Sequence, residues 1–206
     1  MRHLLCCLVV TVMAPADARA QPGELIERTL AIVGTQVITL SDARAAVRLG
    51  LIEADRSADP ASVTQLLVDR ELILREVQRY APPAPSDSSI DARLDEIQMS
   101  LGGARAWARL LDETAFTDVR LRAWVRDDLR AVAYLAQRFA SASTPTDAEI
   151  GVAFTQQRAE FDRSGITFEQ AAPTLRERLV GSRRRELIAD WVTDLRRRTE
   201  VVILPQ

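Results

Sequence analysis

Apolar residues recur at strand-like spacing only near the two ends of the chain. Residues rich in Ile, Val, Leu and Thr, from 29 to 33 and from 37 to 39, stand on either side of Gly34-Thr35-Gln36, a pattern typical of a hairpin with a glycine-containing turn. A second strand-like run, Val201-Val202-Ile203-Leu204, follows near the C-terminus. Because an isolated hairpin is marginally stable in water, we expect this run to join it as a third strand and to bring the chain ends together.

The segments between these runs show helical spacing of apolar residues, and several have start signals. Ser41 is predicted to cap a helix that ends near Gly50. Asp59-Pro60 combines a capping side chain with a proline suited to the first helical turn, and the helix that follows is expected to reach Tyr80. After a proline-rich linker over 81–86, further helices are predicted over 89–100, 104–113 and 117–140.

Two later helices begin with the pattern of a capping box. Thr146-Asp147-Ala148-Glu149 opens a helix expected to reach Phe161, and Thr167-Phe168-Glu169-Gln170 opens a long helix to about Thr199. Pro173 lacks an amide hydrogen, so we expect it to kink or restart that helix. The whole pattern predicts a mainly α fold with helices over about 41–161, a long C-terminal helix over about 167–199 and a terminal strand over 200–204.

One charged residue interrupts the apolar stripe of each of two helices. Arg70 lies in the middle of the stripe after Pro60, and Asp128 interrupts the stripe after Thr117. Since a buried charge needs a partner, we hypothesise a structural ion pair between Arg70 and Asp128. The alternative, equally favoured, is that Arg70 extends to solvent and Asp128 lies at the edge of the interface. The second stripe consists of Leu121, Val125, Leu129, Val132, Leu135 and Phe139.

The first 20 residues have the pattern of a secretory signal peptide. A basic start at Arg2 precedes an apolar run over 4–13, and Ala18-Arg19-Ala20 offers a cleavage site before Gln21. The apolar run is too short for a membrane anchor, which needs about 20 residues. A lipoprotein signal is disfavoured because Cys6-Cys7 lies inside the apolar run. We therefore expect export to the periplasm and no integral membrane anchor.

Cleavage at this site changes the chemistry that the chain can perform. It removes Cys6, Cys7 and the single histidine, His3, and the sequence contains no lysine. This excludes thiol nucleophiles, histidine bases, Schiff-base lysines, P-loop lysines and the usual zinc sites from the mature chain. Carboxylate pairs remain, so an enzyme is disfavoured without being excluded. We expect no catalytic residue, no metal and no cofactor.

The charge balance of the mature chain gives no attraction to nucleic acid. The 27 basic and 29 acidic residues of the whole sequence become 25 and 28 once Arg2, Arg19 and Asp17 are removed, a net charge of −3. No disulfide can form, so stability has to come from an apolar core.

The order of these elements resembles the N-terminal domain of SurA-type periplasmic chaperones. The resemblance covers nearly the whole mature chain, 21–206. It rests on the run TLAIVGTQVITLSD over 29–42, the run LLVDRELILREV over 66–77, the helix over 116–139, the run TDAEI over 146–150, and the segment from FEQAAP at 168–173 to Leu204.

The resemblance implies one chaperone module of the trigger factor/SurA peptide-binding type. In that family, parvulin-type prolyl isomerase domains are inserted before the C-terminal helix. Here the passage from Phe161 to Thr167 leaves no room for a domain of about 100 residues. The implied function is an ATP-independent periplasmic holdase for unfolded secreted or outer-membrane proteins. A degenerate prolyl isomerase and a dedicated subunit of an envelope assembly complex remain alternatives, and a separate isomerase or assembly partner stays open.

Aromatic side chains are candidates for the client-binding surface. Tyr134 points away from the main stripe of its helix, and Trp107, Phe116 and Trp124 are equally ambiguous. Each has two interpretations: packing in the core, which we favour, and one wall of a client groove.

Overall fold

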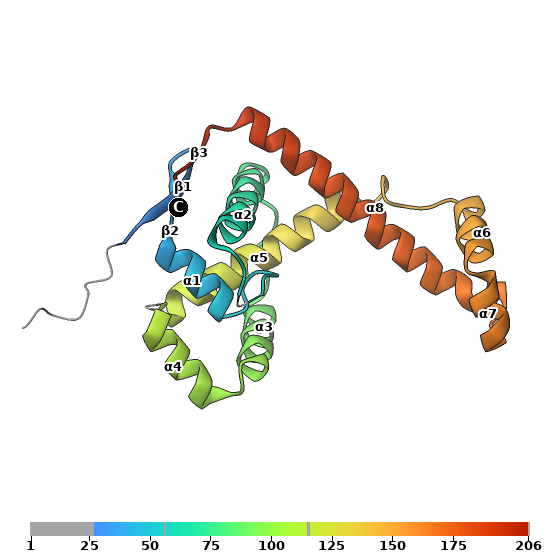
Figure 1. The fold of residues 1–206 in the computed structure, drawn as a ribbon, viewed down its shortest axis with the longest axis horizontal. Helices are drawn as coiled ribbons and strands as arrows, with labels where there is room; N and C mark the ends of the chain where they lie inside the picture. The colour runs from blue at the N-terminus through green and yellow to red at the C-terminus, as the bar shows by residue number, and fades with distance from the viewer. Residues whose placement is uncertain (1–26, 56, 115, 206) are drawn as a thin grey trace, which may run out of the picture.

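The computed structural model describes residues 27–55, 57–114 and 116–205, and the predicted signal peptide lies outside these ranges. Helices dominate, which confirms the predicted mainly α fold (Figure 1). The elements are, in order, β1 (Thr29–Val33), β2 (Gln36–Thr39), α1 (Leu40–Arg48), α2 (Pro60–Tyr80), α3 (Asp87–Ser100), α4 (Ala104–Thr114), α5 (Asp118–Arg138), α6 (Asp147–Gln156), α7 (Arg158–Ser164), α8 (Phe168–Arg198) and β3 (Val201–Ile203).

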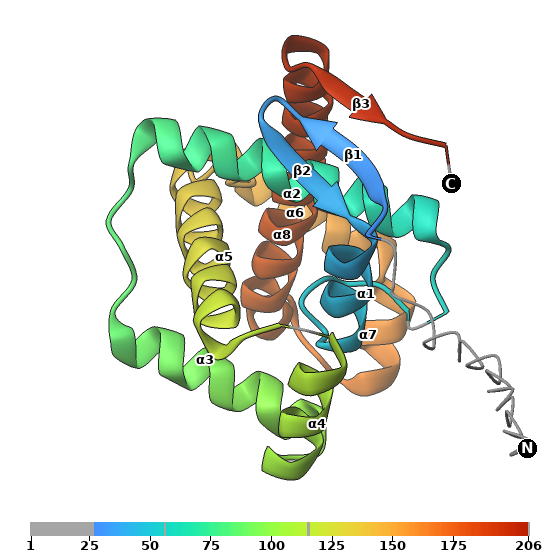
Figure 2. The ribbon, with the colours of Figure 1, turned by 90° about the vertical axis from the view of Figure 1, so that its left-hand side faces the viewer.

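The three strands form one antiparallel sheet in the order β2-β1-β3. Ile32 in the central strand lies opposite Val37 on one side and Val202 on the other. The predicted association of the C-terminal run with the hairpin is therefore confirmed, and Figure 2 shows β3 alongside the hairpin. Gly34 makes the turn with a φ of 59°, and a Cβ there would crowd the guanidinium of Arg75. The turn therefore needs a glycine.

The sheet, α1 to α5 and the C-terminal half of α8 form one unit, which we call the body. Its main apolar cluster joins the sheet to α2, α5 and α8. Arg196 fastens α8 to α2, because its guanidinium lies 2.7 Å from Asp69 Oδ1 and donates to the carbonyl of Gln65 at 3.2 Å. Fully buried members of the cluster include Leu30, Val33, Val68, Leu72 and Val77.

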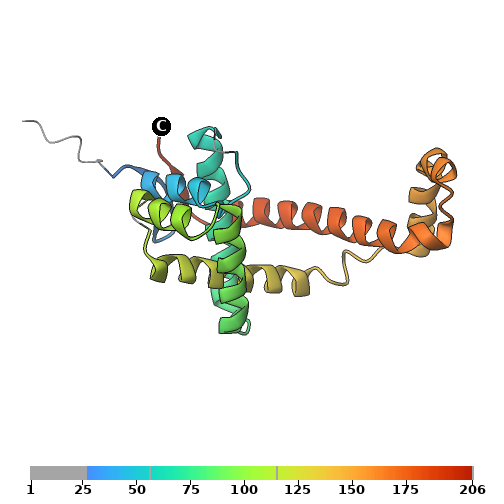
Figure 3. The same cartoon turned by 90° about the horizontal axis from the view of Figure 1, so that it is seen from below.

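The helices α6 and α7 pack against the N-terminal half of α8 and form a second unit, the tip. Figures 1 and 3 show the tip at the far end of α8 from the sheet. Its apolar cluster is separate from that of the body and contains Ile150, Ala153, Ala171 and Leu175. The α5–α6 linker is tied to α8 by Arg183, which donates to the carbonyl of Thr144 at 3.2 Å.

The start of α1 differs from the prediction that Ser41 caps it. The cap is Thr39, whose hydroxyl accepts from the Asp42 amide at 3.2 Å, while the Thr39 amide donates to Asp42 Oδ2 at 3.1 Å. Ser41 instead donates its hydroxyl to Glu27 at 2.7 Å. The prediction was wrong because the helix follows β2 directly, so the last strand residue occupies the capping position.

Other expectations about where helices begin and end also differ from the structure. The helix α3 begins two residues before the expected start, because the Ser86 hydroxyl accepts from the Ser89 amide at 3.1 Å. The helix expected over 146–161 is broken at Gln157 into α6 and α7. By contrast, α8 is not restarted at Pro173, which lies near its N-terminus. Only the first helical turns precede this proline, so few backbone hydrogen bonds are affected.

Candidate functional site

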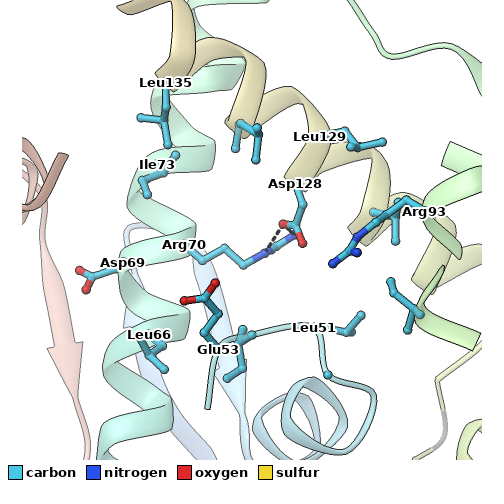
Figure 4. Close-up of a pocket in the computed structure, with 16 residues that line it drawn as sticks. Leu51, Glu53, Leu66, Asp69, Arg70, Ile73, Arg93, Asp128, Leu129 and Leu135 are labelled. Atoms are coloured by element: carbon cyan, nitrogen blue, oxygen red, sulfur yellow. Dashed lines mark hydrogen bonds and ion pairs between the residues drawn. The ribbon is translucent and has the colours of Figure 1, made fainter. Parts of the chain in front are cut away.

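The body carries a groove of about 460 Å³ between α2, α5, α3 and the segment after α1. We call it the α2–α5 groove (Figure 4). Several of its apolar side chains are partly or largely exposed, above all Leu66 at 39% and Val132 at 64%. The groove therefore offers apolar surface to a ligand. Its apolar lining includes Leu51, Ile52, Leu66, Ile73, Leu129, Val132 and Leu135.

The groove exists because the apolar stripe of α5 is divided between two environments. Leu121 and Val125 are buried, as expected from the stripe. Val132, expected in the same stripe, is largely exposed, whereas Tyr134 is buried on the other side of the helix. Val132 lies on the predicted stripe and lines the groove. Tyr134 faces α8 instead, where its ring lies 6.2 Å from that of Trp191 between centroids.

Arg70 and Asp128 meet across the α2–α5 groove. The Arg70 Nε donates to Asp128 Oδ1 at 2.8 Å, and Nη2 donates to the carbonyl of Trp124 at 3.4 Å. The guanidinium also lies 3.6 Å from the centroid of the Trp124 ring. Figure 4 shows the pair spanning the space between α2 and α5. Ion pairing and stacking together hold the Arg70 head group in one position.

Burial and the positive charge of Arg70 shift the pKa of Asp128 in opposite directions. Burial raises the pKa of Asp128, and the positive charge of Arg70 and its hydrogen bond act in the opposite direction. Burial likewise raises the pKa of Glu71, next to Arg70 on α2. The ionised carboxylate of Asp128 therefore depends on Arg70 for compensation, which makes the pair a structural feature of the groove.

The aromatic residues considered for client binding lie elsewhere. Phe116 is only 3% exposed and Tyr134 only 7% exposed. Their burial agrees with core packing, which is the favoured interpretation of the two. Trp107 and Trp124 are partly buried and pack against apolar clusters of the body. None of the four lines the α2–α5 groove.

Sequence reasoning missed the groove residues that do not belong to a helical stripe. Leu51 and Ile52 follow Gly50 in a short connecting segment and line the groove together with α2 and α5. Two adjacent apolar residues in a segment outside any periodic pattern were the available signal. On α2, the exposed Leu66 and the partly buried Ile73 line the same groove.

Comparison with known proteins identifies the fold. No family model matches the chain, and no curated protein matches it. Among solved structures, one from Campylobacter jejuni matches with a TM-score of 0.51 and 11% sequence identity, covering 87% of this chain and all of the other. It comes from work on two structurally related SurA-like chaperones, the virulence factor PEB4 and the periplasmic protein Cj1289. The fold is that of SurA-type chaperones.

Two features of this SurA-type fold concern the predictions about an inserted domain and a membrane anchor. The helix α7 ends at Ser164 and α8 begins at Phe168, so three residues connect them. Across the described residues, no helix combines the length and the apolar composition needed to cross a bilayer.

Proposed function

We propose that residues 21–206 form an ATP-independent periplasmic chaperone, a holdase for unfolded secreted or outer-membrane proteins, and that the α2–α5 groove is its client-binding surface. The observation that carries the proposal is an open, largely apolar groove with charged side chains among its lining, within a SurA-type fold. Clients of a general chaperone share apolar character without sharing sequence, so adaptable apolar surface suits them. No catalytic residue and no cofactor form part of the proposal.

The energetics of such a groove favour reversible binding. Each apolar side chain transferred from water contributes about 1.5–3 kcal/mol. Association itself costs at least about 4 kcal/mol. A client that inserts three or four apolar side chains therefore binds weakly enough to leave without ATP, and its own folding competes with rebinding. While bound, its apolar segments are shielded from aggregation.

The direct test measures aggregation of unfolded clients. Outer-membrane proteins and unrelated secreted proteins are diluted from urea with and without the chain from Gln21 onward, and light scattering is followed. Suppression for several unrelated clients is the expected result. Suppression for one client alone would instead favour a dedicated complex subunit. Acceleration of proline-limited refolding would favour the degenerate prolyl isomerase.

A further inference from the structure

The charged residues of the α2–α5 groove are nearly all engaged with one another or with neighbours. The Asp69 carboxylate lies 2.7 Å from the guanidinium of Arg196 on α8. Arg93 lies 2.8 Å from Glu96, one turn further along α3. Together with the pair described above, these contacts occupy four of the five charges in the groove. The charged lining residues are Glu53, Asp69, Arg70, Arg93 and Asp128.

The exception is Glu53, in the segment between α1 and α2. Figure 4 shows its carboxylate directed from the segment after α1 toward the side chain of Arg70. Within the described ranges, no basic side chain lies within 4 Å of this carboxylate, and the residue is exposed. Among the residues that the structure describes, Glu53 is thus a groove-lining carboxylate without an ion-pair partner, beside the apolar lining.

We propose that the α2–α5 groove selects apolar client segments that carry a cationic side chain, arginine or lysine, and disfavours equally apolar segments that carry a carboxylate. This proposal deepens the proposed function and rests on it. A client cation placed among the apolar lining meets Glu53. A client carboxylate is repelled by the same charge. The two guanidiniums that line the groove already have ion-pair partners. Selectivity therefore comes from attraction and repulsion together.

The first experiment compares three fluorescein-labelled peptides with one shared apolar sequence and a central Arg, Gln or Glu. Fluorescence anisotropy gives their affinities for the chain from Gln21 onward. Because Glu53 is exposed, we expect the Arg peptide to bind about threefold tighter than the Gln peptide and the Glu peptide to bind weakest. The differences should shrink in about 0.5 M NaCl, since salt screens exposed charges.

The second experiment assigns the preference to Glu53. The Glu53→Gln variant should bind all three peptides with nearly equal affinity. The matched control, Glu160→Gln, changes an exposed glutamate of α7 in the tip and should leave the order of the three peptides unchanged.

The outcomes separate this inference from the proposed function. Equal affinities for all three peptides, or tightest binding of the Glu peptide, would overturn the charge preference while leaving apolar client binding intact. Persistence of the preference in Glu53→Gln would overturn the assignment to this residue. Absence of binding by all three peptides would overturn both the inference and the proposed function.

Discussion

Arg70 on α2 pairs with Asp128 on α5 at 2.8 Å and stacks over Trp124, one helical turn before its partner. The side chain of Arg70 is 19% exposed and that of Asp128 is 37% exposed, so the pair lies between a buried and a surface ion pair. It links the two helices that form the groove. Its energetic role can therefore be separated from the role of the apolar lining.

A double-mutant cycle measures this link. We expect Arg70→Met and Asp128→Asn each to lower the free energy of unfolding by about 1–3 kcal/mol, because each leaves a partly buried polar group without its partner. The coupling energy between them should be about 1–2 kcal/mol, reduced by the solvent access of Asp128. Urea unfolding followed by circular dichroism gives all four values.

The exposed pair Arg93–Glu96 on α3 provides the control for this cycle. Its partners are one turn apart and both largely exposed, so coupling of only about 0.2–0.5 kcal/mol is expected there. Equal coupling in the two cycles would show that the pair across the groove is no stronger than an ordinary surface pair.

Glu71 should make the protein less stable at neutral pH than in mild acid. Burial raises the pKa of Glu71, and nearby Asp127 adds to the effect, while Arg70 and Arg75 oppose it. A carboxyl whose pKa is higher in the folded state than in the unfolded state stabilises the fold while it is protonated. This stabilisation is fully present below the unfolded pKa, about 4.3, and is lost as the pH rises through the folded pKa. The substitution Glu71→Gln removes this loss.

The advantage of Glu71→Gln over the unsubstituted protein should therefore be small near pH 4 and grow toward pH 7. Urea unfolding at half-unit steps of pH measures the difference in free energy of unfolding. A difference that stays constant, or that shrinks as the pH rises, would show that the ionised carboxylate is compensated in the folded protein.

Local chemistry in the sequence predicted much of the fold. Asp59 caps α2 and Thr146 forms a capping box with Glu149, as predicted, because these interactions depend only on residues within one turn. The strand near the C-terminus was also predictable, since a hairpin alone would be marginal. The break at Gln157 was not, because nothing in the pattern of that segment ends a helix.

The groove was less predictable than the helices that form it. Periodicity placed Val132 and Val125 on one stripe, but only the way in which α2, α5 and α8 pack decides which part of a stripe is covered. The same packing buried Tyr134, which periodicity had placed away from the main stripe. A single sequence shows which residues share a face of each helix. Which of those faces stays uncovered depends on contacts between segments that are distant in the sequence.

Two valines on α5 test whether the groove binds clients. Val132 lines the groove and is 64% exposed, and Val119 is 81% exposed but does not line it. Because both are exposed, substitution by serine should change stability by no more than about 0.5 kcal/mol. We expect Val132→Ser to weaken suppression of client aggregation and Val119→Ser to leave it unchanged, as measured by light scattering. Equal loss in both variants would indicate diffuse apolar binding along the helix.

Glu149 should control the stability of the tip independently of the body. Its carboxylate accepts from the Thr146 amide at 2.7 Å and also pairs with Arg183 of α8. The amide hydrogen bond, together with the Arg183 and Thr146 side chains, lowers the pKa of Glu149 to about 2. A lowered pKa means that the stabilisation is present above the unfolded pKa and is lost as the pH falls toward 2.

Substitution of Glu149 should therefore affect the tip first, because its apolar cluster is separate from that of the body. Hydrogen exchange at neutral pH should show faster exchange of α6 amides in Glu149→Ala, with α2 amides unchanged. Glu149→Gln keeps a capping side chain but loses the charge facing Arg183, so its α6 amides should exchange at an intermediate rate. Faster exchange throughout α2 would instead mean that the tip and the body unfold as one cooperative unit.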